Sequence, residues 1–188
     1  MPDTIRTFIA FEIPEHVLSA IGNIQGVLKS YKFNIKWVRP ESIHLTLKFL
    51  GNIDPAAMDQ IESVLRDTVK PHAPFFVQAK GLGVFPGAKR PRVLWIGITG
   101  QIDRLIGLQQ HLDKDLKAIG FSGDKRPFKG HLTLGRVKGS IDANRMRSVL
   151  AKYNEFEAEP FTVGPLILYR SDLHPTGAVY TKLFHVTL

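Results

Sequence analysis

A four-residue phrase, His-Leu-Thr-Leu, occurs twice in the sequence, at residues 44–47 and at residues 131–134. In each copy polar and apolar residues alternate, which is the pattern of a half-buried β-strand. Because successive side chains of a strand point to opposite faces, the histidine and the threonine share one face and the two leucines share the other. Two imidazoles and two hydroxyls presented in this way are the groups needed for acid–base chemistry on a phosphate.

Cleavage of a phosphodiester requires a base that takes a proton from the nucleophile and an acid that gives one to the leaving oxygen. Imidazole titrates near pH 6.5, so one neutral and one protonated histidine supply both functions near neutral pH. His44 and His131 are the candidates, and the hydroxyls of Thr46 and Thr133 can each hold a non-bridging phosphate oxygen. The scheme needs no metal, and a histidine with a threonine two residues later is an unusual ligand pair. A lone histidine on a strand is more often structural, but the duplication favours chemistry.

The composition of the chain indicates what kind of protein carries this motif. The chain has 188 residues, of which 44% are hydrophobic, so it can form a substantial core, and its formal net charge of +8 favours a polyanionic partner such as nucleic acid. The absence of cysteine excludes disulfides, thiolate metal sites and a cysteine nucleophile. We find neither a secretory signal nor a membrane-spanning stretch, and we expect a cytoplasmic protein that does not act at a membrane.

Periodicity predicts the elements that position the two motifs. Strands are expected at residues 6–13, 35–38, 43–50, 75–82, 92–98, 131–137, 155–163, 166–173 and 179–186, and helices at 15–30, 54–69, 103–119 and 143–153. The order helix, His-x-Thr strand, helix, strands occurs twice. We therefore predict an α+β fold over residues 1–188 as a single bilobal, pseudo-duplicated domain. Two antiparallel sheets flanked by helices would bring the motifs together at a central active-site cleft.

The segments His44-Leu45-Thr46-Leu47-Lys48-Phe49-Leu50-Gly51 and His131-Leu132-Thr133-Leu134-Gly135-Arg136 resemble the signature motifs of the two-histidine (2H) phosphoesterases. Within that group the chain is similar to the RNA 2′,3′-cyclic phosphodiesterases, historically called 2′-5′ RNA ligases. The similarity extends to the opening segment at residues 6–14, to residues 37–42 and 126–128 before the motifs, and to residues 168–173. One departure is Gly130, because family members commonly have proline before the second histidine.

The resemblance implies hydrolysis of RNA or nucleotide 2′,3′-cyclic phosphates to 2′-phosphates without a metal or other cofactor. By position, His44 and His131 are then the acid–base pair, and Thr46 and Thr133 bind the phosphate. We favour His131 as the group that activates water and His44 as the group that protonates the leaving oxygen, although the sequence leaves this polarity open. The expected partners are RNA ends or cyclic nucleotides, and a monomer is the default.

Two further residues are candidates for substrate binding. Arg136 can contact phosphate or a stacked base, but strict alternation places it on the leucine face unless a bulge at Gly135 turns it around. A solvent-facing arginine at a strand end is the alternative. Phe11 is a candidate for stacking on a nucleobase, although a place in the core on the first strand is the favoured interpretation. Lys48 shares the His44 face by alternation, and the loop at residues 89–92 can follow an RNA backbone or can simply be solvated.

Two other functions remain open alongside hydrolysis. The same site can join RNA ends through a 2′-5′ linkage by the reverse reaction, although water favours hydrolysis. A non-catalytic module that binds RNA ends or nucleotides would also need a basic surface, but it would not need two proton carriers. Both His-x-Thr pairs are intact, which favours an enzyme. The glycines at residues 81–87 are not followed by the lysine and serine or threonine of a P-loop.

Overall fold

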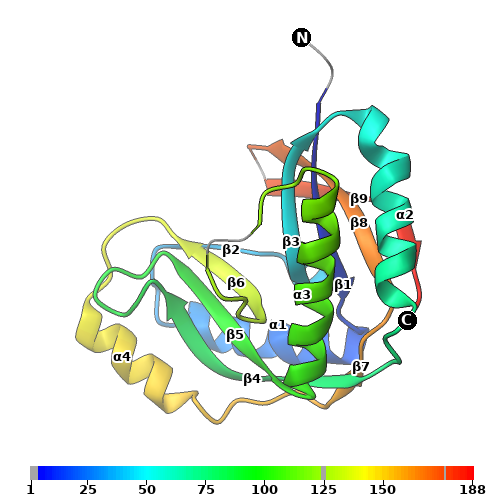
Figure 1. Cartoon of the computed structure of the whole chain (residues 1–188). Coiled ribbons are helices and arrows are strands. Elements are labelled where there is room, and N and C mark those ends of the chain that lie inside the picture. The colour runs from blue at the N-terminus through cyan, green and yellow to red at the C-terminus, as the bar shows by residue number, and fades with distance from the viewer. Residues whose placement is uncertain (1–3, 124–125, 176) are drawn as a thin grey trace.

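The computed structural model describes residues 4–123, 126–175 and 177–188. A curled antiparallel sheet and four α-helices pack together, which confirms the α+β class (Figure 1). In chain order the elements are β1 (Ile5–Glu12), α1 (Glu15–Lys29), β2 (Ile35–Trp37), the 3₁₀ turn η1 (Pro40–Ser42), β3 (His44–Ile53), the 3₁₀ turn η2 (Pro55–Ala57), α2 (Met58–Val69), β4 (Phe76–Phe85), β5 (Val93–Gly100), α3 (Ile102–Ala118), β6 (His131–Val137), α4 (Ala143–Lys152), β7 (Phe161–Thr162), β8 (Leu166–His174) and β9 (Gly177–Val186).

The sheet is narrowest in its hydrogen bonding where the two motif strands, β3 and β6, meet. Its strand order is β7-β4-β5-β6-β3-β1-β8-β9, and β2 also pairs with β6. Strands β3 and β6 are joined through one residue pair, Leu45 with Leu132, whereas the neighbouring strand pairs extend over many residues. The expected two sheets are in fact one continuous sheet, because this single pair joins its two sides. We call β3, β1, β8 and β9 the first lobe, and β6, β2, β5, β4 and β7 the second lobe.

Each lobe is covered by two helices on the face that holds the core. Helices α2 and α3 pack against each other and against β9 and β3 of the first lobe (Figure 1). Helix α1 lies under the second lobe, where the buried Gln25 donates hydrogen bonds from Nε2 to the carbonyls of Val38 and Leu134, at 2.9 and 3.0 Å. The hydroxyls of Tyr31 and Tyr153, 3.1 Å apart, connect the end of α1 with the end of α4.

The lobes do not follow the two halves of the sequence. The chain runs β1-α1-β3-α2-β4 and then β5-α3-β6-α4-β8, which is one order repeated. The last strand of each repeat pairs with the first strand of the other, β4 with β5 and β8 with β1. Helix α1 follows a first-lobe strand but packs under the second lobe, and α3 does the reverse. Each lobe is therefore assembled from both repeats, and the two are interlocked.

Local signals explain most element boundaries. Asp54 accepts a hydrogen bond from the Ala56 backbone N–H at 2.9 Å, but the first turn is the 3₁₀ turn η2, so α2 begins only at Met58. Asp142 caps α4 in the same way. The strand expected at residues 155–163 was wrong in length, since the segment forms only an isolated bridge of Glu157 with Lys80 and the two-residue strand Phe161–Thr162. Pro160 explains this result, because it donates no backbone hydrogen bond to a sheet.

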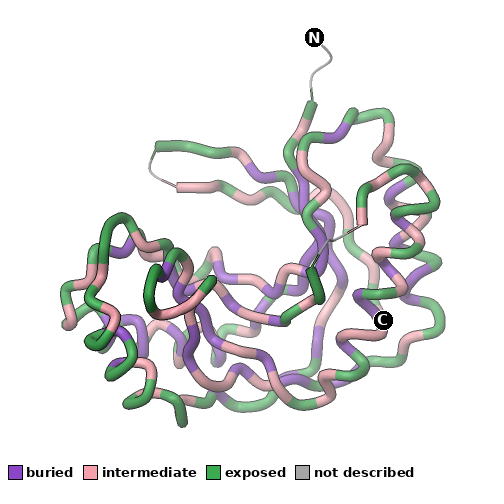
Figure 2. Tube along the Cα trace, turned by 60° about the vertical axis from the view of Figure 1, so that its left-hand side comes forward, coloured by how far each residue is buried: buried purple, intermediate pink, exposed green. Residues whose placement is uncertain are grey.

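The buried side chains form one main core between the sheet and the helices. Figure 2 shows buried residues along the strands and on the inner faces of the helices, while the outer end of the β8–β9 hairpin is exposed. That hairpin reaches the second lobe, where the Lys36 ammonium donates to the carbonyl of Pro175 at 3.3 Å. None of the helices in the described part of the chain is long and apolar enough to span a membrane.

Candidate active site

The four motif side chains gather on one face of the sheet at the junction of the lobes. Leu45 and Leu132, the middle residues of the two His-x-Thr units, are directly paired and fully buried in the core. By alternation, the histidine and threonine on either side of each leucine point to the opposite face, which we call the site face. Antiparallel pairing then sets His44 towards Thr133, and His131 towards Thr46. The structure thus brings together the four residues that the sequence selected.

Both histidines are held by the same hydrogen bond. The Nδ1–H of His44 donates to the carbonyl of Ser42 at 2.9 Å, and that of His131 donates to the carbonyl of Lys129 at 2.7 Å. A carbonyl only accepts, so the proton of each neutral ring lies on Nδ1 and the lone pair lies on Nε2. In each case the acceptor is two residues before the histidine, where the chain enters the motif strand. The two rings are therefore oriented alike, with Nε2 available for proton transfer.

Aromatic rings enclose His44. The Phe8 ring stacks on its imidazole, with centroids 4.6 Å apart, and Tyr180 meets it edge to face at 5.1 Å. The Tyr169 ring stacks on Phe8 at 5.1 Å and also lies 6.2 Å from the His44 ring. These residues come from β1, β8 and β9, so three strands of the first lobe build the surroundings of one histidine. Sequence reasoning did not identify any of the three, because only the pairing of distant strands places them here.

His131 has a different environment. Phe85, the last residue of β4, meets its ring edge to face at 5.0 Å, and Trp95 lies at 6.3 Å. The Lys129 ammonium lies 4.5 Å from the centroid of the Trp95 ring, which holds a cation next to the histidine. His131 therefore has positively charged neighbours, whereas His44 is lined by neutral rings.

The pKa values of both histidines are lowered. Burial lowers the pKa of His44 to about 4, against the opposing effect of the Ser42 hydrogen bond, and the positive charge of His131 adds to the lowering. Burial also lowers the pKa of His131, and the charges of Lys129 and Arg136 act in the same direction. Both rings are therefore neutral at pH 7 when the site is empty.

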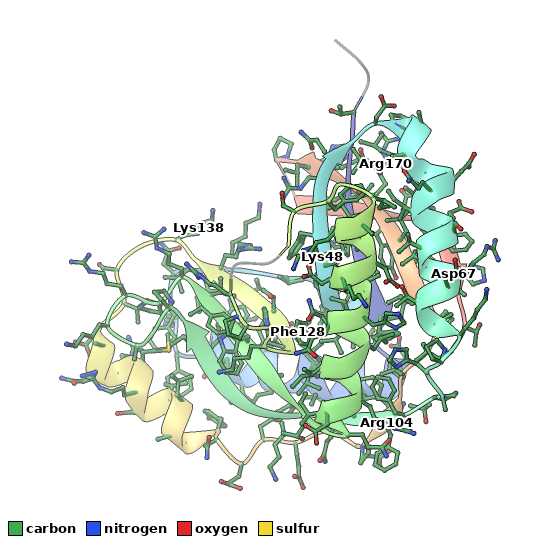
Figure 3. All side chains as sticks on the ribbon, in the orientation of Figure 1. Lys48, Asp67, Arg104, Phe128, Lys138 and Arg170 are labelled. Atoms are coloured by element: carbon green, nitrogen blue, oxygen red, sulfur yellow. The ribbon has the colours of Figure 1, made fainter. Side chains whose placement is uncertain are left out.

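A bulge in each motif strand changes the face of the residues that follow it. Thr46 and Lys48 pair with the consecutive residues Ala10 and Ile9, so Leu47 is the extra residue. Lys48 consequently turns to the core side, where its ammonium contacts the Asp113 carboxylate at 2.6 Å and the Ser122 carbonyl at 2.8 Å (Figure 3). The expectation that Lys48 shares the face of His44 was wrong for this reason.

The second bulge settles the orientation of Arg136. Thr133 and Gly135 pair with the adjacent residues Trp95 and Leu94, so the extra residue is Leu134, one position before the expected Gly135. Arg136 therefore lies on the same face of the sheet as His131. Its positive charge lowers the pKa of that histidine. Phe49 follows His44 by five residues, just as Arg136 follows His131 by five residues. The Phe49 ring is 61% exposed and lies 5.9 Å from the Phe8 ring.

The assignment of Phe11 to substrate binding was wrong. Phe11 is fully buried in the main core and packs edge to face against Phe75, with centroids 6.5 Å apart. It lies three residues after Phe8 on β1, and an odd separation places two residues on opposite faces of a strand. Phe8 is the aromatic residue of β1 that reaches the site face. Ile9 and Phe11 are two residues apart, so the alternation of faces along β1 places Phe11 on the same buried face as Ile9.

Two cavities adjoin the site face. One, of about 430 Å³, is lined by residues 89–92 and 136–141 and includes Arg136. The other, of about 210 Å³, lies beside His44 and is lined among others by Glu12, Glu41 and Lys182. In the described ranges of the chain, no group of three or more histidine, aspartate or glutamate side chains is arranged to hold a metal ion.

Comparison with known proteins gives a consistent result. The model of the family described as LigT-like phosphoesterases matches residues 11–95 and again residues 96–180, in agreement with the structural repeat. An RNA 2′,3′-cyclic phosphodiesterase of Methanothermobacter thermautotrophicus is 34% identical over 179 residues, which cover 95% of this chain and 96% of the relative. The protein of the same name from Aquifex aeolicus is 33% identical over 178 residues, 94% of each chain.

Solved structures show the same fold. The crystal structure of TT0787 from Thermus thermophilus superposes with a TM-score of 0.80 at 27% identity, covering 98% of both chains. The structure of E. coli LigT without ligand has a TM-score of 0.77 at 20% identity, also over 98% of both chains. The family model and the two sequence relatives confirm the family that the two motifs predicted: the chain belongs to the LigT-like phosphoesterases, a family of two-histidine phosphoesterases.

Proposed function

We propose that the protein hydrolyses the 2′,3′-cyclic phosphate at the end of an RNA or on a nucleotide and releases a 2′-phosphate. The observation that carries this proposal is the matched pair of histidines, each with Nδ1–H fixed on a carbonyl and Nε2 left for proton transfer. The substrate class is supported by the name shared by the relatives, RNA 2′,3′-cyclic phosphodiesterase.

In the proposed reaction each histidine moves one proton. Nε2 of His131 takes a proton from water as the water oxygen forms a bond to phosphorus. The bond between phosphorus and O3′ breaks, and the protonated Nε2 of His44 gives its proton to O3′. The hydroxyls of Thr46 and Thr133 donate hydrogen bonds to the non-bridging oxygens, where negative charge accumulates. The product is a 2′-phosphate with a free 3′-hydroxyl, and exchange of protons with solvent restores both histidines.

In the empty site burial disfavours the protonated form of both histidines, so the proton that the acid carries must be stabilised by the substrate. The cations Lys129 and Arg136 disfavour the protonated form of His131, which suits a base. The rings of Phe8 and Tyr169 stack beside His44 and can contact its imidazolium once the substrate anion has induced protonation. Protonating His44 at pH 7 from a pKa of about 4 costs about 4 kcal/mol. A phosphodiester anion about 4 Å away returns about 4 kcal/mol at an effective dielectric constant of about 20. Substrate binding can therefore charge the acid.

Two exposed side chains are proposed to position the substrate. Arg136 presents a guanidinium beside His131, which suits a bidentate contact with phosphate oxygens. Phe49 presents an exposed ring beyond Phe8 on the same face as His44, which suits stacking of the terminal base. The site thus offers a phosphate contact on one side and an aromatic surface on the other.

Catalysis explains the site better than binding alone. A module that only recognises an RNA end needs positive charge, but the half-buried His44 is neutral in the empty site and contributes none. Two rings with the same fixed tautomer meet a requirement of proton transfer rather than of affinity. The expected cytoplasmic location and monomeric state belong to the same proposal, and light scattering of the purified protein tests the second.

The test is turnover of adenosine 2′,3′-cyclic phosphate by His44→Ala and His131→Ala variants in buffer with excess EDTA. We expect each variant to lose about 10²–10⁴-fold in kcat. His16→Ala is the matched control, since His16 is exposed on α1 outside the site. Circular dichroism establishes that each variant is folded. Turnover near the wild-type rate in either site variant would remove that histidine from the mechanism.

A further inference from the structure

The larger cavity, beyond Arg136, is strongly basic. Five of its ten lining residues are lysine or arginine and none is acidic; the five are Lys89, Arg90, Arg92, Arg136 and Lys138. They come from the β4–β5 loop and from the end of β6, and Figure 3 shows Lys138 in the loop that leads from β6 to α4. A volume of about 430 Å³ is within the range of sites for small organic ligands.

These cations have no carboxylate partner within the described residues. Other basic side chains of the protein form ion pairs, for example Lys80 with Glu157 at 2.9 Å and Lys182 with Glu12 at 2.7 Å. None of the five cavity cations takes part in such a pair. Five cations around one cavity repel one another, and a bound polyanion relieves that repulsion.

The backbone holds the two basic segments together. The Arg92 N–H donates to the carbonyl of Phe85 at 2.7 Å, which closes the base of the β4–β5 loop. The Val137 N–H donates to the carbonyl of Arg92 at 2.9 Å, and Val93 pairs with Arg136. The loop and the end of β6 are therefore fixed relative to each other, so their charges are organised before a ligand arrives.

The cavity adjoins the proposed site through Arg136. Arg136 lines the cavity, and its charge also lowers the pKa of His131. Phe85, at the base of the basic loop, packs against the His131 ring. The cavity beside His44 differs, because Glu12 and Glu41 line it and Lys182 is paired with Glu12. A polyanionic chain that leaves the site is thus attracted on the His131 side, whereas the carboxylates of Glu12 and Glu41 on the His44 side are paired with Lys182 and Arg39.

We propose that the basic cavity binds the backbone phosphates that precede the terminal nucleotide of an RNA strand, so that the preferred substrate is an oligonucleotide rather than a cyclic mononucleotide. This inference rests on the proposed function, because it assumes that the cyclic phosphate lies between the two histidines. The RNA strand then enters the site along the end of β6 and the β4–β5 loop, with its 5′ side over the basic cavity.

The salt dependence of catalysis measures such contacts. For single strands the logarithm of the affinity falls with the logarithm of salt concentration by about 0.7 for each phosphate that is neutralised. Two phosphates in the cavity predict that kcat/KM falls about sevenfold between 50 and 200 mM salt. The same change of salt affects a mononucleotide less, since it carries no upstream phosphate.

The experiment compares adenosine 2′,3′-cyclic phosphate with a five-nucleotide RNA that ends in a 2′,3′-cyclic phosphate. The test variant is Arg90→Gln/Lys138→Gln in the cavity. The control variant is Arg104→Gln/Lys114→Gln on α3, which removes the same number of positive charges away from the cavity. We expect wild type to prefer the oligonucleotide. The cavity variant should lose about fivefold or more in kcat/KM on the oligonucleotide at 50 mM salt and most of its salt dependence, which corresponds to two lost phosphate contacts. Its turnover of the mononucleotide should equal that of wild type, and the α3 variant should match wild type on both substrates.

The outcomes separate the two proposals. Hydrolysis of the mononucleotide by wild type without a preference for the oligonucleotide would overturn the basic-cavity assignment and leave the proposed function intact. An equal loss in the cavity and α3 variants would also overturn it, because the effect would then reflect total charge. Failure of wild type to cleave either substrate would count against the proposed function itself.

Discussion

Protonation of His44 should destabilise the fold by an amount that the structure sets. Its pKa is about 4 in the folded protein, where burial disfavours the imidazolium, and about 6.5 in an unfolded chain. The unfolded chain therefore binds this proton more tightly, so the free energy of unfolding decreases as the pH falls from about 6.5 to 4. Integration from pH 7 to pH 4 gives a loss of about 3 kcal/mol from this one ring.

A substitution isolates this contribution from those of other titrating groups. Urea unfolding, followed by tryptophan fluorescence at pH 7, 6, 5 and 4, gives the free energy of unfolding of wild type and of His44→Gln. We expect wild type to lose about 3 kcal/mol more than the variant over this range. His16→Gln, an exposed control on α1, should lose as much as wild type. Parallel curves for wild type and His44→Gln would refute the claim that His44 is held neutral by burial.

Four other predictions follow from single features of the fold. Gln25→Leu removes two buried hydrogen bonds between α1 and the second lobe and should lower the free energy of unfolding by about 1–3 kcal/mol in urea; an unchanged midpoint would contradict this. Arg136→Gln removes a positive charge beside His131, so the pKa of His131 should rise in an NMR titration; no rise would place Arg136 away from that ring. Phe49→Ala should raise KM for a cyclic purine nucleotide about tenfold with kcat unchanged, since base stacking is worth about 1–3 kcal/mol; a loss confined to kcat would argue against stacking. The chain divided after Gly100 should give two fragments that do not fold alone, because β8 pairs with β1 across the division; cooperative unfolding of either fragment would show separable domains.

Local patterns in the sequence predicted most of what lies within one element. The alternation of His44-Leu45-Thr46 and its repeat predicted which side chains share a face of each motif strand. The residues immediately before and after a buried leucine must both lie on the opposite face. Apolar spacing located all four α-helices to within a few residues, apart from the 3₁₀ turn before α2. These features depend on neighbouring residues, which a single sequence contains in full.

The features that failed depend on distant partners. The bulge at Leu47 moves Lys48 to the core and Phe49 to the site face, and it is visible only in the pairing of β3 with β1. Tyr169 and Tyr180 lie more than a hundred residues after His44 and reach it because β8 crosses to the first lobe. Pairing of this kind depends on how the whole sheet closes, so no local pattern indicates it.

The two repeats have diverged around a common centre. Each supplies a histidine, a threonine and a bulge, but the fifth residue after the histidine is Phe49 in one and Arg136 in the other. The first repeat therefore offers an aromatic surface and the second a charge. A nucleotide has the same two parts, a base and a phosphate, which gives a physical reason for unequal repeats to be maintained in one site.

Phosphorus NMR of adenosine 2′,3′-cyclic phosphate, incubated with the purified protein in excess EDTA, tests the central claim most directly. The two-histidine mechanism predicts that the cyclic phosphate signal is replaced by that of the 2′-phosphate alone. It also predicts that His44→Ala and His131→Ala leave the cyclic phosphate intact over the same period. A cyclic phosphate that persists with wild type, or a product that is the 3′-phosphate, would contradict the account.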